Sequence, residues 1–569
     1  PIPPLSCESE GSNVVKRRRY EPVYQPTNVL GLRETEKRQR LQQTFLGIFA
    51  GLLSLMAGVS YVLVEPTTLL VPILLLTATL LPAVLWYFPR LALYGIFGSA
   101  ILFEIFQQIK SGEGLTDAVP FFWNINTMFE NYLGTNPKVA PINFFELVLI
   151  IFSGVTLLRF ATRQQVHVRC GSLFWPILGY LGFVAVGWFN GMATGGNFNE
   201  ALQEIRAQFY FGVAYFLSVN AIKTRKDIDK LIWITFICIT LKVFNYIYRH
   251  MIIFHGEIQD GGVGSHEEAF FFVSFIILLS VLSISRVQQK LQILMWALLP
   301  FVLYANITTN RRTAYAAMVI AMPVLFLSAY KGFPSARKNI IRVLMAIIVL
   351  FPPYFIAFRD SSGALGGPAR AINSAISPNE RDSSSDIYRQ SENYDLMFTM
   401  RSSPVSAAIG YGYGKRFLTP ASLDAIKDIY IWYTLLPHNQ ILWVWMRIGT
   451  LGFLVFWGMI CAIIVYACRI IRFQDQKTGG DGDTYPRFVA LYTLILVSLL
   501  LVFGLLDLQL SNFRNMIFVA IWIGAMVGIA PNAMTLNDPK KRRYRPRVGG
   551  QEPTRHRPAA SHLPSRSAR

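Results

Sequence analysis

Long apolar runs recur along this chain from residue 45 to residue 530, and they constrain its fold more than any other feature. Each run has roughly 16 to 22 residues, and a helix needs about 20 apolar residues to cross the hydrocarbon core of a bilayer. Strands of a membrane barrel are about 10 residues long and alternate polar with apolar positions, whereas these runs are apolar all round. We therefore predict an all-α polytopic membrane protein.

The composition supports this prediction. Of the 569 residues, 53% are hydrophobic and 15% are charged, whereas a soluble protein has about 25% charged residues. We expect about fourteen transmembrane helices, with 12–14 as the range, because two of the runs (91–106 and 208–222) are short. The predicted segments are 45–64, 69–88, 91–106, 142–160, 173–190, 208–222, 231–248, 268–285, 291–308, 313–329, 340–357, 448–468, 488–505 and 515–530.

The distribution of Lys and Arg predicts the topology. With the N-terminus inside, the short inner connections carry more than twice as many of these residues as the short outer connections. Basic residues collect on the cytoplasmic side of membrane proteins, and an even helix count returns the chain to the same side. We therefore predict that both termini lie in the cytoplasm.

The net charge of +20 is concentrated in two tails, 1–44 and 531–569, which are rich in Pro, Ser and Arg. We predict that both tails are disordered and basic, and that they lie next to anionic membrane lipids. Charge placed in this way does not indicate a nucleic-acid partner. Among the five cysteines no CxxC pair suggests a metal site.

One connection is much longer than the others. Residues 358–437 form a loop of about 80 residues between the first eleven helices (45–357) and the last three (438–530). The predicted topology places this loop outside the cytoplasm, and loops of this length are usually functional. The stretch 424–436 is rich in apolar and aromatic residues, so we expect short helices in the loop, one of them at the membrane interface.

Charged and polar residues gather at the predicted outer helix ends, where the positive-inside rule disfavours arginine. Ordinary outer loops also contain some charge, but several of these short loops each retain an arginine, which suggests a shared anionic ligand. The planar guanidinium of arginine suits phosphate. The residues are Arg206, His266, Glu267, Glu268, Arg311, Arg312, His438, Asn439, Arg447, Asp507 and Arg514.

His438 follows Pro437 at the start of an apolar segment, directly after the long loop. A neutral imidazole accepts a proton from a hydroxyl, so histidine often acts as a general base. The alternative is that His438 only caps the helix or lies at the interface. His266 in GSHEEAF lacks a second spaced metal ligand, so no metal is predicted there.

Several other features remain open. GYGYG, Gly410 to Gly414, is predicted to form a tight outer turn that lets the backbone approach a ligand. Arg447 either binds phosphate or reaches the lipid headgroups. Lys242 and Glu104 lie within or near membrane spans, where charge is usually paired or functional, and the sequence assigns a role to neither.

Four motifs in order resemble the O-antigen ligase and polymerase family of bacterial membrane glycosyltransferases. They begin with Arg206 and with a helix-opening Arg312-Thr313-Ala314, where the family has Arg-Gly-Ala. The loop then supplies a Pro followed by Gly-x-Gly, and the last motif is His-Asn, Leu and Gly-x-x-Gly. The matching residues of these last two motifs are Pro404, Gly410, Gly412, Gly414, His438, Asn439, Leu442, Gly449 and Gly452.

The resemblance implies metal-independent, inverting glycosyl transfer without a cofactor. The donor would be a saccharide on a polyprenyl diphosphate, and the acceptor a hydroxyl of a glycolipid, glycan or protein. Arg206 and Arg312, or Arg311 in place of Arg312, would bind the diphosphate. His438 would take the acceptor proton, and Asp507 would orient His438 or meet the acceptor. The remaining expected substrate contacts are Arg389, Arg401, Gly410, Gly412 and Asn439.

Two other classes of membrane protein are alternatives to a glycosyltransferase. A transporter or flippase of lipid-linked saccharides could also have about fourteen helices, but it would need polar residues along a path through the membrane, and many such folds contain internal repeats. The chain has no evident repeat, and its cationic and histidine residues gather on one predicted side. A receptor-like membrane protein is the second alternative. The sequence does not distinguish a ligase from a polymerase.

Overall fold

The computed structural model is helical throughout the residues that it describes, with only one isolated bridge between Asn124 and Asn143. The described residues are 84–104, 122, 124, 126, 142–161, 168–257, 262–361, 366–378, 380–421, 434–475 and 484–535. Ten helices in these ranges are long and apolar enough to cross a membrane. The all-α membrane class is therefore confirmed, while the count of about fourteen stays a prediction.

Every predicted segment from residue 91 onward corresponds to a helix, although some boundaries differ. The first part of the bundle contains α3 (Pro89–Leu102), α5 (Phe144–Ala161), α6 (Phe174–Ala193), α7 (Phe198–Ala221), α8 (Arg225–Tyr248), α9 (Glu268–Ser285) and α10 (Gln289–Thr308). The remainder contains α11 (Arg312–Gly332), α12 (Arg337–Phe358), α17 (Gln440–Asp475), α18 (Thr484–Leu506) and α19 (Phe513–Thr535). The tails 1–44 and 536–569, the segment 45–64 and most of 69–88 lie outside the described residues.

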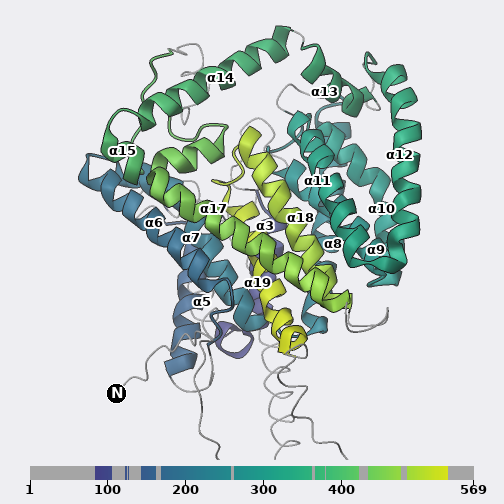
Figure 1. Cartoon of the computed structure of the whole chain (residues 1–569), viewed down its shortest axis with the longest axis horizontal. Helices are drawn as coiled ribbons and strands as arrows, with labels where there is room; N and C mark the ends of the chain where they lie inside the picture. Colours follow the sequence, from purple (N-terminus) through teal and green to yellow (C-terminus); the bar gives the residue numbers. More distant parts are fainter. Residues whose placement is uncertain are drawn as a thin grey trace, which may run out of the picture.

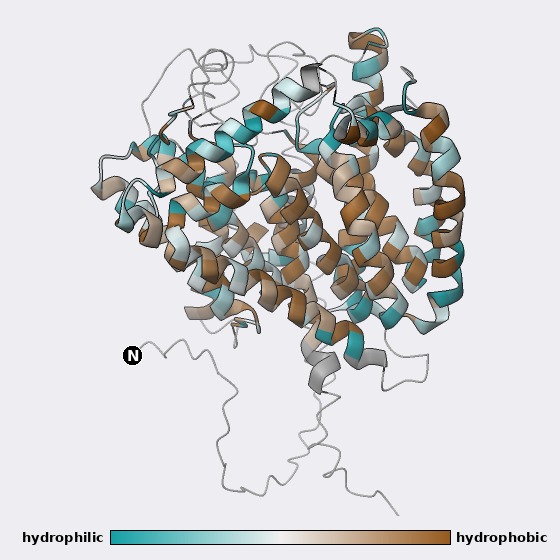
Figure 2. Ribbon diagram, turned by 45° about the horizontal axis from the view of Figure 1, so that its top comes forward, coloured by the Kyte–Doolittle hydropathy of each residue, from teal (hydrophilic) through white to brown (hydrophobic). Residues whose placement is uncertain are grey.

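Helix α19 forms the centre of the bundle and packs extensively against α7. Its span Phe513–Ala530 is wholly buried, which explains why it is apolar on every side. Helix α12 is the opposite case, because only 6% of its apolar window is buried. Figure 1 places α12 at one edge of the molecule, and the ribbon in Figure 2 shows that hydrophobic residues predominate in the helices of the bundle.

Helix α7 begins at Phe198, ten residues before the predicted segment 208–222. The Asn197 side chain accepts hydrogen bonds from the backbone N–H groups of Asn199 and Glu200, so it caps the helix start. The first turns of α7 carry polar residues, and the hydropathy pattern therefore missed them. This extension places Glu204 and Arg206 on the helix.

In its described residues the long loop contains the helices α13 (Gly367–Ile376), α14 (Glu380–Met400) and α15 (Pro404–Ile409). Helices α13 and α14 lie across one end of the bundle in Figure 1. The structure thus has helices in this loop, as predicted, but α14 has 21 residues and is longer than expected. Most of the predicted interfacial helix 424–436 lies outside the described residues.

Helix α17 begins at Gln440, earlier than the predicted 448–468, and is interrupted at Gly449. Gly449 has φ 69° and ψ −179°, a conformation that only glycine adopts readily. A Cβ atom on Gly449 would lie 2.4 Å from the carbonyl oxygen of Ala408, so α15 packs directly against this break. The break separates a short outer segment, which follows His438, from the long apolar span.

Candidate active site

His438 lies at the start of α17, where its neighbours fix the backbone. Asn439 caps the helix, because its side-chain oxygen accepts a hydrogen bond from the backbone N–H of Leu442 at 3.1 Å. This cap fixes the helix start next to His438, while the predicted substrate contact of Asn439 stays a prediction. The His438 side chain is 26% exposed and remains accessible to a substrate.

The carboxylate in contact with His438 is Glu392 of α14. Glu392 Oε2 accepts a hydrogen bond from the His438 backbone N–H at 2.9 Å, and a Glu392 oxygen lies 3.4 Å from Nδ1. The Tyr388 hydroxyl donates to Glu392 Oε1 at 3.3 Å. The Tyr388 ring also meets the imidazole edge-on, with centroids 5.5 Å apart. Glu392 is buried, so the loop helix and the helix bundle meet at His438.

Asp507 lies just after α18 and is buried, with its Oδ1 atom 3.8 Å from Nδ1 of His266. Burial alone raises the pKa of Asp507, but His266 and the charges of Arg311 and His438 hold this pKa well below its ordinary value. Asp507 is therefore ionised at neutral pH. The predicted group of polar residues is thus brought together in part: Asp507 pairs with His266 and interacts with His438 through its charge.

Arg311 and Arg312 differ in their surroundings. Burial lowers the pKa of the Arg311 guanidinium, and the positive charge of Arg389 lowers it further. The negative charges of Asp507 and Glu267 raise this pKa, so Arg311 lies among these three charged residues. Arg312 instead donates from Nη1 to the Ser374 hydroxyl of α13 at 3.2 Å. The sequence analysis preferred Arg312 for the phosphate, whereas Arg311 is the arginine that lies among Asp507, Glu267 and Arg389.

The two loop arginines are also separated. Arg389 is half-buried on α14 within electrostatic reach of Arg311. Arg401 is exposed just beyond the end of α14, and twelve residues of helix correspond to about 18 Å. Only Arg389 is therefore near the other candidate residues.

Arg206 is held by protein partners near the start of α7. Its Nε atom forms an ion pair with Glu146 Oε1 at 2.8 Å, and Nη1 donates to Gln203 at 2.7 Å. The guanidinium is almost fully buried. A diphosphate would therefore have to share or displace Glu146, and the role of Arg206 in phosphate binding stays a prediction.

The GYGYG segment forms the predicted tight turn, with φ 110° at Gly410 and 90° at Gly412. Its close contacts are made to protein rather than to an open ligand site. A Cβ atom on Gly412 would lie 2.5 Å from the backbone of Gly191, and one on Gly410 would lie 2.2 Å from the carbonyl oxygen of Arg447. The backbone N–H of Gly414 donates to Glu204 at 2.6 Å.

Arg447 holds this turn in place. Its guanidinium is fully buried, pairs with Glu204, and donates to the carbonyl oxygens of Gly412 at 2.8 Å and Lys415 at 2.7 Å. Both roles that the sequence left open, phosphate binding and a reach to the headgroups, are therefore wrong. A buried guanidinium with a carboxylate and several carbonyl partners is a structural link.

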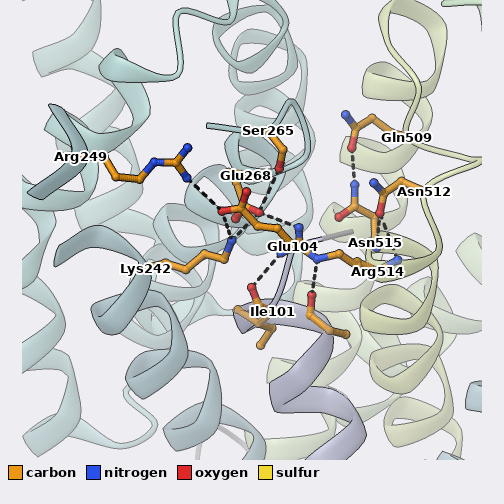
Figure 3. Close-up of polar contacts among 11 residues, drawn as sticks. Ile101, Glu104, Lys242, Arg249, Ser265, Glu268, Gln509, Asn512, Arg514 and Asn515 are labelled. Atoms are coloured by element: carbon orange, nitrogen blue, oxygen red, sulfur yellow. Dashed lines mark hydrogen bonds and ion pairs between the residues drawn. The ribbon is translucent and has the colours of Figure 1, made fainter. Parts of the chain in front are cut away.

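Lys242 and Glu104 belong to a cluster of buried charges, shown in Figure 3. Lys242 pairs with Glu268 and lies 3.4 Å from Glu104, while Arg514 Nη1 pairs with Glu268 Oε1 at 2.6 Å. Arg249 lies 3.7 Å from Glu104. The cluster joins α3, α8, α9 and α19. Two of its members, Glu268 and Arg514, are close in sequence to His266 and Asp507. The ion pairs explain how the charges of Lys242 and Glu104, to which the sequence assigned no role, are tolerated within the membrane spans.

No group of three or more His, Cys, Asp or Glu side chains in the described ranges is placed to hold a metal ion. The residue in contact with His438 that the sequence analysis did not single out is Glu392. Its carboxylate stands 46 positions before His438, in a polar loop whose sequence has no pattern that marks one acidic residue over another. Only the way α14 packs on α17 brings the two together.

These features define a helical membrane protein whose long loop contacts a cluster of histidine, arginine and carboxylate groups. The family model described as O-antigen ligase (Wzy_C) matches residues 296–457 of this chain. The match confirms the predicted resemblance to the O-antigen ligase and polymerase family. Comparison with curated proteins gave no match.

The matched segment includes Arg311, Arg389, Glu392 and His438, whereas Arg206 and Asp507 lie outside it. The match supports glycosyltransferase activity of the O-antigen ligase or polymerase type, with a lipid-linked saccharide and an acceptor as partners. Together with the apolar helices, it indicates a bacterial membrane protein.

Proposed function

We propose that this protein transfers a saccharide from a polyprenyl-diphosphate donor to a hydroxyl group of a glycolipid, glycan or protein. The reaction takes place at the outer face of the bacterial inner membrane and inverts the anomeric centre. The observation that carries this proposal is the position of His438. A partly exposed imidazole lies at a rigid helix start, within electrostatic reach of Asp507, which is itself within reach of Arg311.

In this mechanism His438 acts as the general base. Its ring nitrogen takes the proton from the acceptor hydroxyl while the acceptor oxygen forms a bond to the anomeric carbon. The bond between that carbon and the diphosphate oxygen breaks, and its electron pair leaves with the diphosphate. Attack from the face opposite the diphosphate inverts the configuration.

Arg311 and Arg389 are the main candidates to stabilise the departing diphosphate, with Arg206 and Arg312 as further contributors. Positive groups fixed in a partly dehydrated site stabilise charge that develops on a leaving group. Burial lowers the pKa of the Arg311 guanidinium, and the negative charge of Asp507 offsets part of this effect. In this proposal the arginine side chains stabilise the charge of the departing diphosphate. The proposed reaction therefore needs neither a divalent metal nor a cofactor.

The central test is transfer by purified protein in detergent or liposomes, with a polyprenyl-diphosphate glycan and an acceptor hydroxyl, in the presence of EDTA. We expect release of the polyprenyl diphosphate and formation of the new glycoside. His438→Ala should reduce the transfer rate at least 100-fold, since a positioned base contributes about 10²–10⁴-fold.

The control is His255→Ala, which removes a histidine that lies beyond α8 and away from the proposed base. This variant should transfer at the normal rate. Full activity of the His438→Ala protein, or activity that depends absolutely on an added divalent metal, would contradict the mechanism. Movement of intact donor across the membrane without glycoside formation would favour a flippase instead.

A further inference from the structure

We propose that Glu392 is a positioning residue that completes the base, so that His438 and Glu392 act as a dyad. This inference rests on the proposed function and deepens it. Its physical basis is that one buried carboxylate contacts both the backbone and the side chain of the same histidine.

The contacts fix which ring nitrogen can act as the base. Glu392 lies on the Nδ1 side of the imidazole at 3.4 Å, so the carboxylate favours the tautomer that carries its proton on Nδ1. The lone pair is then on Nε2, which can accept a proton from the acceptor hydroxyl. Hydrogen bonds of this kind shorten when a catalytic complex forms.

The same carboxylate stabilises the imidazolium that forms after proton transfer. Glu392 is 1% exposed, so water screens its charge poorly. The Tyr388 hydroxyl, which donates to Oε1 at 3.3 Å, helps to hold the carboxylate in this orientation. The backbone contact of 2.9 Å to His438 N fixes the histidine main chain to the same group.

The two members of the dyad come from different parts of the chain. Helix α14 of the long loop supplies Glu392, and the start of α17 supplies His438. The base is therefore complete only while α14 packs against α17. In this way the loop that lies over the bundle takes part directly in preparing the base, in addition to any contact that it makes with sugar.

Among the described residues, charged and titratable groups act on this dyad from two elements. On α14 they are Tyr388 and, next to Glu392, Asp395; from the segment after α18, Asp507 acts on His438 through its charge. Asp507 remains when Glu392 is neutralised. The imidazolium then keeps one carboxylate nearby and loses the one in contact with Nδ1.

The test compares Glu392→Gln with the unchanged protein. The glutamine oxygen can still accept from the His438 backbone N–H, so the variant removes charge while it preserves the structural link. We expect kcat to fall about 100-fold, with KM for the donor unchanged. We also expect the acidic limb of the kcat/KM profile to move to lower pH, because the protonated imidazole has lost a stabilising carboxylate.

Two further variants separate charge from structure. Glu392→Asp keeps the charge and should recover part of the lost rate. Asp386→Asn, which neutralises another carboxylate of α14, should leave both the rate and the pH profile unchanged. A Glu392→Gln protein with normal kcat and an unshifted acidic limb would refute the dyad even though His438→Ala is inactive. A fully active His438→Ala protein would instead contradict the proposed function, on which the dyad rests.

A second measurement is independent of the folding of any Glu392 variant. NMR of the unchanged protein labelled with ¹⁵N-histidine, with the His438 signal assigned by its loss in His438→Asn, reports which nitrogen carries the proton. We expect the Nδ1–H tautomer at neutral pH. Observation of the Nε2–H tautomer would overturn the proposal.

Discussion

At the scale of single residues, two adjacent arginines at the start of α11 have different surroundings. Arg311 lies among the charges of Asp507, Glu267 and Arg389, whereas Arg312 reaches the Ser374 hydroxyl in the loop helix α13. A diphosphate bound near His438 could form charge-assisted hydrogen bonds with the Arg311 guanidinium. Arg312 would act mainly by holding the loop.

We therefore predict that Arg311→Gln lowers kcat/KM more than Arg312→Gln does. Loss of one charge-assisted hydrogen bond costs about 1.5–3 kcal/mol, which corresponds to about 10- to 150-fold in kcat/KM. Arg312→Gln should reduce kcat/KM less than 10-fold, because the contact that it removes joins α11 to the loop helix α13. Steady-state transfer rates of both variants show which substitution lowers kcat/KM more. A larger fall for Arg312→Gln would indicate that Arg312 binds the phosphate.

At the scale of helices, the buried charges of Figure 3 connect four elements that are far apart in the sequence. Glu268 opens α9 and pairs with Lys242 of α8 and with Arg514 of α19. The Arg514 guanidinium also donates to the carbonyl oxygens of Ala100 and Ile101 in α3, at 2.9 Å each. One carboxylate thus fixes the ends of α8, α9 and α19 relative to one another.

Glu268→Gln should destabilise this arrangement, because it leaves two buried cations without their shared carboxylate. Removal of one partner from a buried ion pair costs about 3–5 kcal/mol. We expect a clear fall in the thermal unfolding midpoint of the detergent-purified protein. Glu257→Gln, which changes an exposed glutamate after α8, is the matched control and should leave the midpoint unchanged. Equal midpoints for both variants would show that the cluster contributes little.

At the scale of the whole molecule, hydropathy predicted the helices but not how their polar ends meet. Each apolar run from residue 91 onward became a helix, because lipid and the bundle interior both require apolar side chains. Hydropathy missed the first turns of α7, whose polar residues are buried by pairing, as in Arg206 with Glu146. The His438 base candidate followed from its motif, whereas Glu392 and the structural role of Arg447 depend on packing between distant segments.

The proposed topology concerns the whole molecule and can be tested by the position of two exposed residues. Arg312 at the start of α11 contacts α13 in the long loop, and α11 has 21 residues, a length of about 31 Å. The exposed Ser335, which follows α11, therefore lies near the opposite face of the membrane from α14. The excess of Lys and Arg in the short connections on the Ser335 side assigns that face to the cytoplasm.

We predict that Gln390→Cys, on an exposed position of α14, reacts with a membrane-impermeant thiol reagent in intact spheroplasts. Ser335→Cys should react only after the membrane is permeabilised. Both variants are made in a protein whose five native cysteines have been replaced by serine, so that each label reports one position. Labelling of Ser335→Cys alone in intact spheroplasts would invert the topology. It would place His438 in the cytoplasm, where a donor that must first be moved outward would not reach it.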